Sequence, residues 1–209
     1  AGAVPVDLAA SNCEMAVGCT YKYLNGGPGA PAFIYLRPDL AAEVQPALAG
    51  WLGHDAPFDF DPDYRPAGGI ERMRVGTPPI IQLAALEAAM DIWDGVDMAE
   101  VRKASIALQE LFIKEVEARV PALTLASPRD AQQRGSQVSF RFEEGYAAMQ
   151  ALIARGVIGD FRAPDTMRFG FTPLYLDEAD VLAAVAHIET VMRDKLWDDP
   201  QYRKRSRVT

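Results

Sequence analysis

The stretch that follows Pro121 constrains the fold more than any other part of this 209-residue sequence. Apolar and polar residues alternate in SQVSFRF (136–142) and TMRFGFT (166–172), which is typical of half-buried β-strands. Apolar residues recur at helical spacing in GYAAMQALIARG (145–156) and DEADVLAAVAHIETVMRDKLW (177–197). With ALTLAS and VIGDFR as two shorter candidate strands, the order is strand, strand, helix, strand, strand, helix. This order predicts a compact α+β unit.

Two further helices are expected before this unit. In DMAEVRKASIALQELFIKEVEARVP (97–121), Asp97 and Glu100 have capping-box spacing and Pro121 closes the pattern. One face of this long helix carries Val101, Leu108, Phe112 and Val116, and the helix is a good candidate for joining two domains. TPPIIQLAALEAAMDIW (77–93) is apolar on almost every side, so we expect a buried helix there.

The N-terminal region is less regular. MAVGC (15–19) and PAFIYL (31–36) read as short strands around the stretch GCTYKYLNGGPGAPAF (18–33). Residues 51–77 contain Pro, Gly, Asp and aromatic residues without a period. Long segments of this kind are usually functional or disordered, and the aromatic residues Phe58, Phe60 and Tyr64 favour an ordered one.

Charge and composition argue against several classes of protein. A net charge of -8 argues against a nucleic-acid-binding surface, and the basic residues at the end of the chain (Arg203, Lys204, Arg205, Arg207) read as a solvated tail. The sequence has no run of 18 or more apolar residues and no signal-peptide pattern near its start. We therefore expect a cytoplasmic protein in which Cys13 and Cys19 are reduced, without a membrane partner.

Lys22 is the first candidate for chemistry, because it lies between two tyrosines and before the glycine-rich run NGGPG. A lysine amine attacks a carbonyl when it is unprotonated, and burial among apolar groups favours that form. Glycines let the backbone approach a bulky cofactor, and the Tyr21 phenol can bind a phosphate or donate a proton. The residues alone leave two interpretations open, an exposed loop lysine or a Schiff-base lysine.

Three more residues have both a structural and a functional interpretation. Thr77 is either a plain helix N-cap or part of a phosphate site at the helix N-terminus. Trp51 either fills a core or stacks and donates its N–H, and Arg168 is either a surface residue or a fork for a carboxylate. His54 and His187 look ordinary, and they do not have the spacing of a metal site.

Taken together, five stretches resemble the kynureninase family of fold-type-I enzymes that use pyridoxal 5'-phosphate (PLP). These stretches are GCTYKYLNGGPGAPAF, GWLGH, DFDPDYRPAGGI, RVGTPPI and RGVIGDFRAPDTMRFGFTPLY, and they run nearly from end to end of the chain. The resemblance implies an α/β fold, namely the C-terminal part of the PLP-dependent transferase (aspartate aminotransferase-like) fold. Residues 1–95 would end the large PLP-binding domain, and residues 96–209 would form the linking helix and a small α+β domain.

The resemblance also implies roles for individual residues. Lys22 matches the lysine that forms the Schiff base with PLP, and Tyr21 matches a neighbour with a catalytic and a cofactor-binding role. Tyr21, Trp51 and Thr77 match positions that contact the cofactor phosphate region. Arg168 matches the arginine that binds the substrate α-carboxylate. No metal site is implied.

The implied activity is hydrolysis of L-kynurenine, or 3-hydroxykynurenine, to anthranilate, or 3-hydroxyanthranilate, and L-alanine in tryptophan catabolism. The family enzyme is a homodimer with a shared active site. The resemblance covers only the C-terminal half of the family's chain, so we expect the chain to need the N-terminal half for catalysis. The alternatives are a cysteine desulfurase-like enzyme, in which His rather than Tyr21 would precede the lysine, and a non-catalytic structural module.

Overall fold

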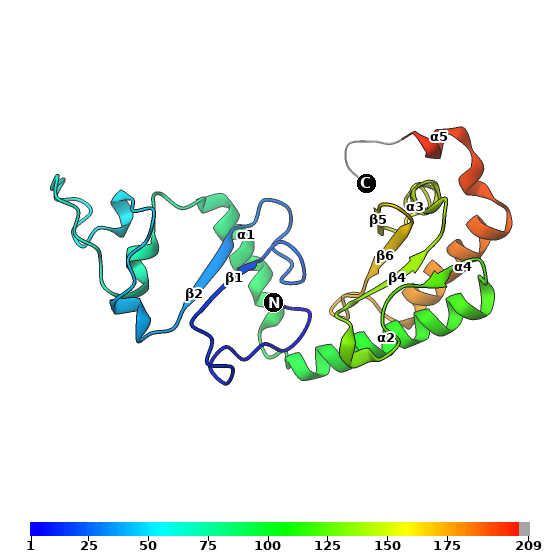
Figure 1. Cartoon of the computed structure of the whole chain (residues 1–209), viewed down its shortest axis with the longest axis horizontal. Helices are drawn as coiled ribbons and strands as arrows, with labels where there is room; N and C mark the ends of the chain where they lie inside the picture. The colour runs from blue at the N-terminus through cyan, green and yellow to red at the C-terminus, as the bar shows by residue number, and fades with distance from the viewer. Residues whose placement is uncertain (205–209) are drawn as a thin grey trace. The chain divides into compact units, whose positions relative to one another are not determined.

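The computed structural model describes residues 1–204 and divides into two compact units, Ala1–Val96 and Asp97–Thr209 (Figure 1). Arg205 and Arg207, which belong to the predicted basic tail, lie outside the described residues.

The second unit is built around a four-stranded antiparallel sheet with the strand order β3-β4-β6-β5. Its strands are β3 (Thr124–Leu125), β4 (Gln137–Arg141), β5 (Asp160–Arg162) and β6 (Thr166–Gly170). Its helices are α2 (Met98–Arg119), α3 (Gly145–Ile153), α4 (Glu178–Arg193) and the short α5 (Pro200–Arg203). Single 3-10 turns lie at Ala131–Gln133 and Leu196–Asp198. The predicted order of strands and helices is confirmed.

The hydrophobic core of this unit lies on one face of the sheet. Val138 and Phe140 of β4 and Met167 and Phe169 of β6 are buried, as period-two alternation requires. The ring of Phe112 from α2 packs at 5.9 Å from Phe140 and 5.1 Å from Phe169. Helices α2 and α4 pack against each other beside the sheet (Figure 1).

The predicted boundaries and buried face of α2 are confirmed. Asp97 is the N-cap and accepts a hydrogen bond from the backbone N–H of Ala99, and the helix ends two residues before Pro121. All four residues of the predicted apolar face are buried: Val101, Leu108, Phe112 and Val116.

A buried polar network joins α2 to the loop before β4. The Arg134 side chain is only 2% exposed and donates to Gln109 Oε1 at 2.9 Å, to two backbone carbonyls and to Glu110. Gln109 donates in turn to Ser105 Oγ, which donates to Ser136 Oγ at 2.9 Å. Because buried polar groups are costly when unpaired, this network holds the loop in one conformation.

The first unit contains two strands and one α-helix. Strands β1 (Met15–Cys19) and β2 (Ala32–Leu36) pair antiparallel, with Val17 opposite Ile34. Helix α1 spans Ile80–Met90. Short 3-10 segments lie at Leu40–Ala42, Trp51–Gly53, Gly69–Met73 and Asp91–Trp93.

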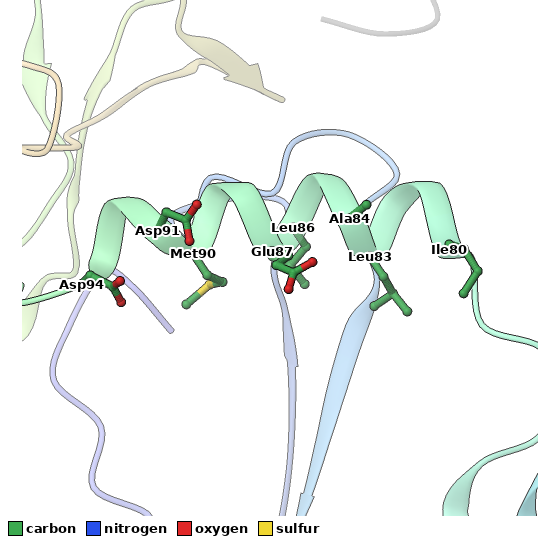
Figure 2. Close-up of a pocket in the computed structure, with 8 residues that line it drawn as sticks. All are labelled: Ile80, Leu83, Ala84, Leu86, Glu87, Met90, Asp91 and Asp94. Atoms are coloured by element: carbon green, nitrogen blue, oxygen red, sulfur yellow. The ribbon is translucent and has the colours of Figure 1, made fainter.

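The prediction that the helix within 77–93 is buried is wrong for this chain. No residue of α1 is buried, and Ile81 is 83% exposed. Leu83, Glu87, Met90 and Asp94 lie on one side of α1 along an open groove (Figure 2). The buried hydrophobic residues of this unit are Leu36 and Ala41, so the unit has no layer that could cover the apolar helix.

The irregular segment from 51 to 77 is ordered by specific hydrogen bonds, as its aromatic residues predicted. His54 is buried; its Nδ1 accepts from the backbone N–H of Ala56 at 2.8 Å, and its Nε2 lies 3.1 Å from the Asp63 carbonyl. The Tyr64 hydroxyl donates to the Gly53 carbonyl at 3.1 Å. His54 is therefore a structural residue of this segment.

The C-terminal basic residues that are described belong to the fold rather than to a solvated tail. Arg203 pairs with Asp198 and Glu144 and lies over the Trp197 ring, and the Lys204 carbonyl accepts from Tyr146. Of the helices formed by residues 1–204, none has the length and apolarity that crossing a membrane requires.

Candidate functional site

Tyr21 and Lys22 lie just after β1, at the start of the glycine-rich loop that leads to β2. Both side chains are exposed in this unit, and the Lys22 ammonium lies 5.2 Å from the centre of the Tyr21 ring. The expected burial of Lys22 is therefore not provided by residues 1–96. The neighbouring Thr20 is buried, and its hydroxyl donates a hydrogen bond to the Pro31 carbonyl. This hydrogen bond joins the two ends of the loop.

The glycines of the loop are required for two different reasons. Gly27 and Gly29 have φ values of +73° and +89°, and residues other than glycine rarely adopt such values. A Cβ on Gly26 would lie 2.8 Å from Ala30 Cβ and 3.1 Å from Leu86 of α1. The loop therefore packs against α1, and its shape is set by backbone conformation and close packing.

Trp51 and the segment before α1 lie close together. A Cβ on Gly50 would meet the Val75 carbonyl oxygen at 1.8 Å, and a Cβ on Gly76 would lie 3.7 Å from the indole Nε1 of Trp51. The Trp51 ring also packs edge-on at 5.7 Å from Phe58 and stays 48% exposed. Trp51 thus places an N–H donor beside the residue that precedes Thr77.

Thr77 itself is exposed, and its prediction as the N-cap of the helix is wrong. Helix α1 begins at Ile80, and Pro79 occupies the N-cap position without a side-chain hydrogen bond. The residue before a proline is disfavoured in the α region, so Pro78 before Pro79 delays the start of the helix. Thr77 lies in the approach to the helix instead.

Arg168 lies at the centre of the sheet in the second unit. It points away from the core side occupied by Met167 and Phe169, and its side chain is 28% exposed. Asp160 lies opposite it on β5 and accepts from Nε and Nη2, both at 2.5 Å. Asp160 was missed by sequence reasoning, although the hairpin around 163–165 places it opposite Arg168.

The structure thus groups the predicted site residues by unit. Tyr21, Lys22, Trp51 and Thr77 belong to the first unit, and Arg168 belongs to the second. His187 is exposed on α4. Among residues 1–204, no group of three or more His, Cys, Asp or Glu side chains is arranged to hold a metal ion.

Comparison with solved structures defines the class of fold. The structure aligns with the cystine C–S lyase C-DES in complex with cysteine persulfide at a TM-score of 0.75 and 23% identity, covering 90% of this chain and 49% of that one. It aligns with the apo cysteine desulfurase from Thermococcus onnurineus at 0.75 and 16% identity, over 92% of this chain and 50% of that one. The fold is that of the C-terminal part of fold-type-I PLP-dependent enzymes.

Within this class, the sequence is similar to that of kynureninases. Residues 101–188 match the kynureninase C-terminal domain family. The whole chain is 50% identical to the kynureninase of Pseudomonas fluorescens and 46% identical to that of Burkholderia mallei. The chain spans about half the length of these relatives, 51% of each. The cysteine desulfurase-like alternative is not favoured, because those neighbours share only the fold.

Proposed function

We propose that this chain is the C-terminal half of a PLP-dependent kynureninase, which hydrolyses L-kynurenine or 3-hydroxykynurenine to the anthranilate and L-alanine. The observation that carries the proposal is the 50% identity to a kynureninase over the full length of the chain. The aligned region covers the whole chain, so it extends over the part with Lys22, Trp51 and Thr77, which lies outside the family domain at 101–188.

The residues of the first unit fit PLP in their chemistry. Lys22 offers an exposed primary amine for the aldehyde, on a loop whose glycines leave open space at Gly27 and Gly29. Trp51 and Thr77 offer an indole N–H and a hydroxyl, which are uncharged donors suited to a phosphate. We therefore assign Lys22, Tyr21, Trp51 and Thr77 to cofactor binding.

Bound PLP would supply an electron sink next to the substrate Cα, and the protein would supply binding and proton transfer. Lys22 is the amine that anchors the cofactor and then moves a proton at the substrate Cα. Tyr21, whose ring lies beside the Lys22 ammonium, is the proton donor for the product carbon. Arg168 holds the substrate α-carboxylate through its planar fork.

We assign residues 1–95 to the end of the large PLP-binding domain and residues 96–209 to the linking helix and small domain. The N-terminal half of the protein is the proposed cover for the first unit. Most of the exposed large hydrophobic residues lie in this unit, including Val17 and Ile34 on the sheet and Ile80 and Ile81 at α1. Apolar surface of this extent marks an interaction site.

Three further properties belong to the proposal. The whole enzyme is a homodimer with a shared active site, acts in tryptophan catabolism and resides in the cytoplasm. The two cysteines support the last point, because both are free thiols.

The test is made with the full-length protein. After loading with PLP, the protein should release anthranilate and alanine from L-kynurenine, and borohydride reduction followed by peptide mapping should find the cofactor on Lys22. The chain from 1 to 209 alone, at the same concentration, should release neither product. Desulfuration of cysteine without kynurenine hydrolysis in the full-length protein would contradict the proposal.

A further inference from the structure

Residues 54–66 form a loop that closes directly after the turn carrying Trp51. His54 and Pro66 form an antiparallel bridge at the base of this loop. Phe58, from within the loop, packs edge-on against the Trp51 ring, with the two ring centroids 5.7 Å apart. Compact surface loops with closed ends, called Ω-loops, are frequently functional. The orientation of Trp51 therefore depends on how firmly this loop is held.

The imidazole of His54 joins the two arms of the Ω-loop. It is buried, and its Nδ1 accepts a hydrogen bond from the Ala56 N–H at 2.8 Å. A neutral imidazole has one ring proton, so Nε2 carries it and donates to the Asp63 carbonyl, 3.1 Å away. The Asp55 carboxylate also lies 3.0 Å from Nδ1, and its charge is paired with that of Arg65. One ring thus holds the outgoing arm at residue 56 and the returning arm at residue 63.

Trp51 has room to change its orientation when this support is lost. It is 48% exposed and lines an open hollow of about 420 Å³ together with His54 and Tyr64. An aromatic side chain with this much open space beside it can occupy more than one rotamer. The contact with the Ω-loop favours the rotamer that sets the indole Nε1 beside Gly76, next to Thr77.

We propose that His54 is a positioning residue for Trp51. By joining the two arms of the Ω-loop, it keeps Phe58 against the indole and keeps the indole N–H available to the cofactor phosphate. A donor that is oriented before binding loses less entropy when the ligand arrives. This inference rests on the phosphate-binding role of Trp51 in the proposed function. His54 acts through Trp51 and does not touch the cofactor.

The experiment measures the binding of PLP, and of pyridoxal, which has no phosphate, to the full-length apoenzyme by titration. His54→Phe keeps an aromatic ring beside Tyr64 but removes both hydrogen bonds of the imidazole. It should weaken PLP binding by about 2- to 5-fold, no more than Trp51→Phe does, and leave pyridoxal binding unchanged. His54→Asn should recover part of the loss, because an asparagine side-chain oxygen can accept from the N–H two residues later.

A double-mutant cycle tests whether His54 acts through Trp51. In the Trp51→Phe background, His54→Phe should cause no further loss of PLP affinity, because two residues that act as one unit are not additive. His187→Phe is the matched control, since it makes the same change at an exposed histidine on α4. It should bind PLP and pyridoxal as the wild type does.

Melting temperatures show whether each variant is folded, and His54→Asn replaces His54→Phe in the cycle if His54→Phe is not. Unchanged PLP affinity, equal losses for PLP and pyridoxal, or the same loss in both backgrounds would overturn the inference. It also fails if Trp51→Phe binds PLP as the wild type does. Kynurenine turnover by the wild type is measured separately, so failure of the proposed function is recognised independently.

Discussion

The Lys22 ammonium lies 5.2 Å from the centre of the Tyr21 ring, and both side chains are exposed at the start of the glycine-rich loop. A cation near an aromatic face is held by a weak attraction, so the amine has a preferred position without being buried. This pair is the part of the chain on which the proposed chemistry depends most.

Lys22→Ala in the full-length protein should abolish steady kynurenine turnover. The loss should be at least about 10²- to 10⁴-fold, which is the contribution of a general acid–base group alone. Turnover is followed by anthranilate fluorescence. Lys103→Ala is a suitable control, because Lys103 lies exposed on α2. Near-normal turnover by Lys22→Ala would remove Lys22 from the mechanism.

Thr77→Ala and Trp51→Phe should each weaken PLP binding by about 1 kcal/mol, or about fivefold, because each removes one hydrogen-bond donor to a charged group. The phenylalanine keeps an aromatic ring beside Gly76, and Thr77→Ser keeps the hydroxyl. PLP affinity is measured by titration of the apoenzyme. If both variants bind PLP like the wild type, neither residue contacts the phosphate.

Arg168→Lys should raise KM for kynurenine while PLP stays bound. A lysine is a point charge and cannot form the planar fork, so kcat/KM should fall by about 30- to 150-fold. A kynurenine analogue without the α-carboxylate is the control substrate, and the variant should handle it no worse than the wild type does. An equal penalty for both substrates would make Arg168 a structural residue.

Arg134→Ala should destabilise the second unit. The substitution leaves the buried Gln109 Oε1 and two backbone carbonyls without their donor, and each unsatisfied group costs about 1–3 kcal/mol. Arg129→Ala is the matched control, because its pair with Glu117 is exposed and should matter little. Thermal unfolding of the full-length protein compares the two. Equal shifts would show that the network adds no stability.

The ion pair between Glu117 and Arg129 should contribute to the loss of folding stability as the pH becomes acidic. The hydrogen bond from Arg129 lowers the pKa of Glu117 below its usual value of 4.5. A lowered folded-state pKa stabilises the protein above the unfolded-state pKa, and this stabilisation is lost as pH falls through the folded-state value. Glu117→Gln should therefore be slightly less stable than wild type near neutral pH and equal to it in strong acid. A difference that persists below the folded-state pKa would contradict this.

Local patterns in the sequence were sufficient for the second unit. The apolar spacing around Val181, Val185 and Ile188 predicts α4, and Asp177 caps it through a capping box. The alternation in β4 and β6 likewise predicts which side chains enter the core. These features depend on residues that are close in the chain, so the periodicity of the sequence is enough to predict them.

The tertiary structure decided what depends on distant residues. The apolar pattern of α1 predicts burial, yet only a covering layer can bury it, and residues 1–96 do not contain one. Thr77 has the residue type of an N-cap, but the two prolines after it move the helix start to Ile80. The register of β5 and β6 places Asp160 opposite Arg168, and this lets their charged side chains form a hydrogen-bonded ion pair. Sequence alone determines residue type and local period, whereas a contact between two side chains exists only once the backbone has brought them together.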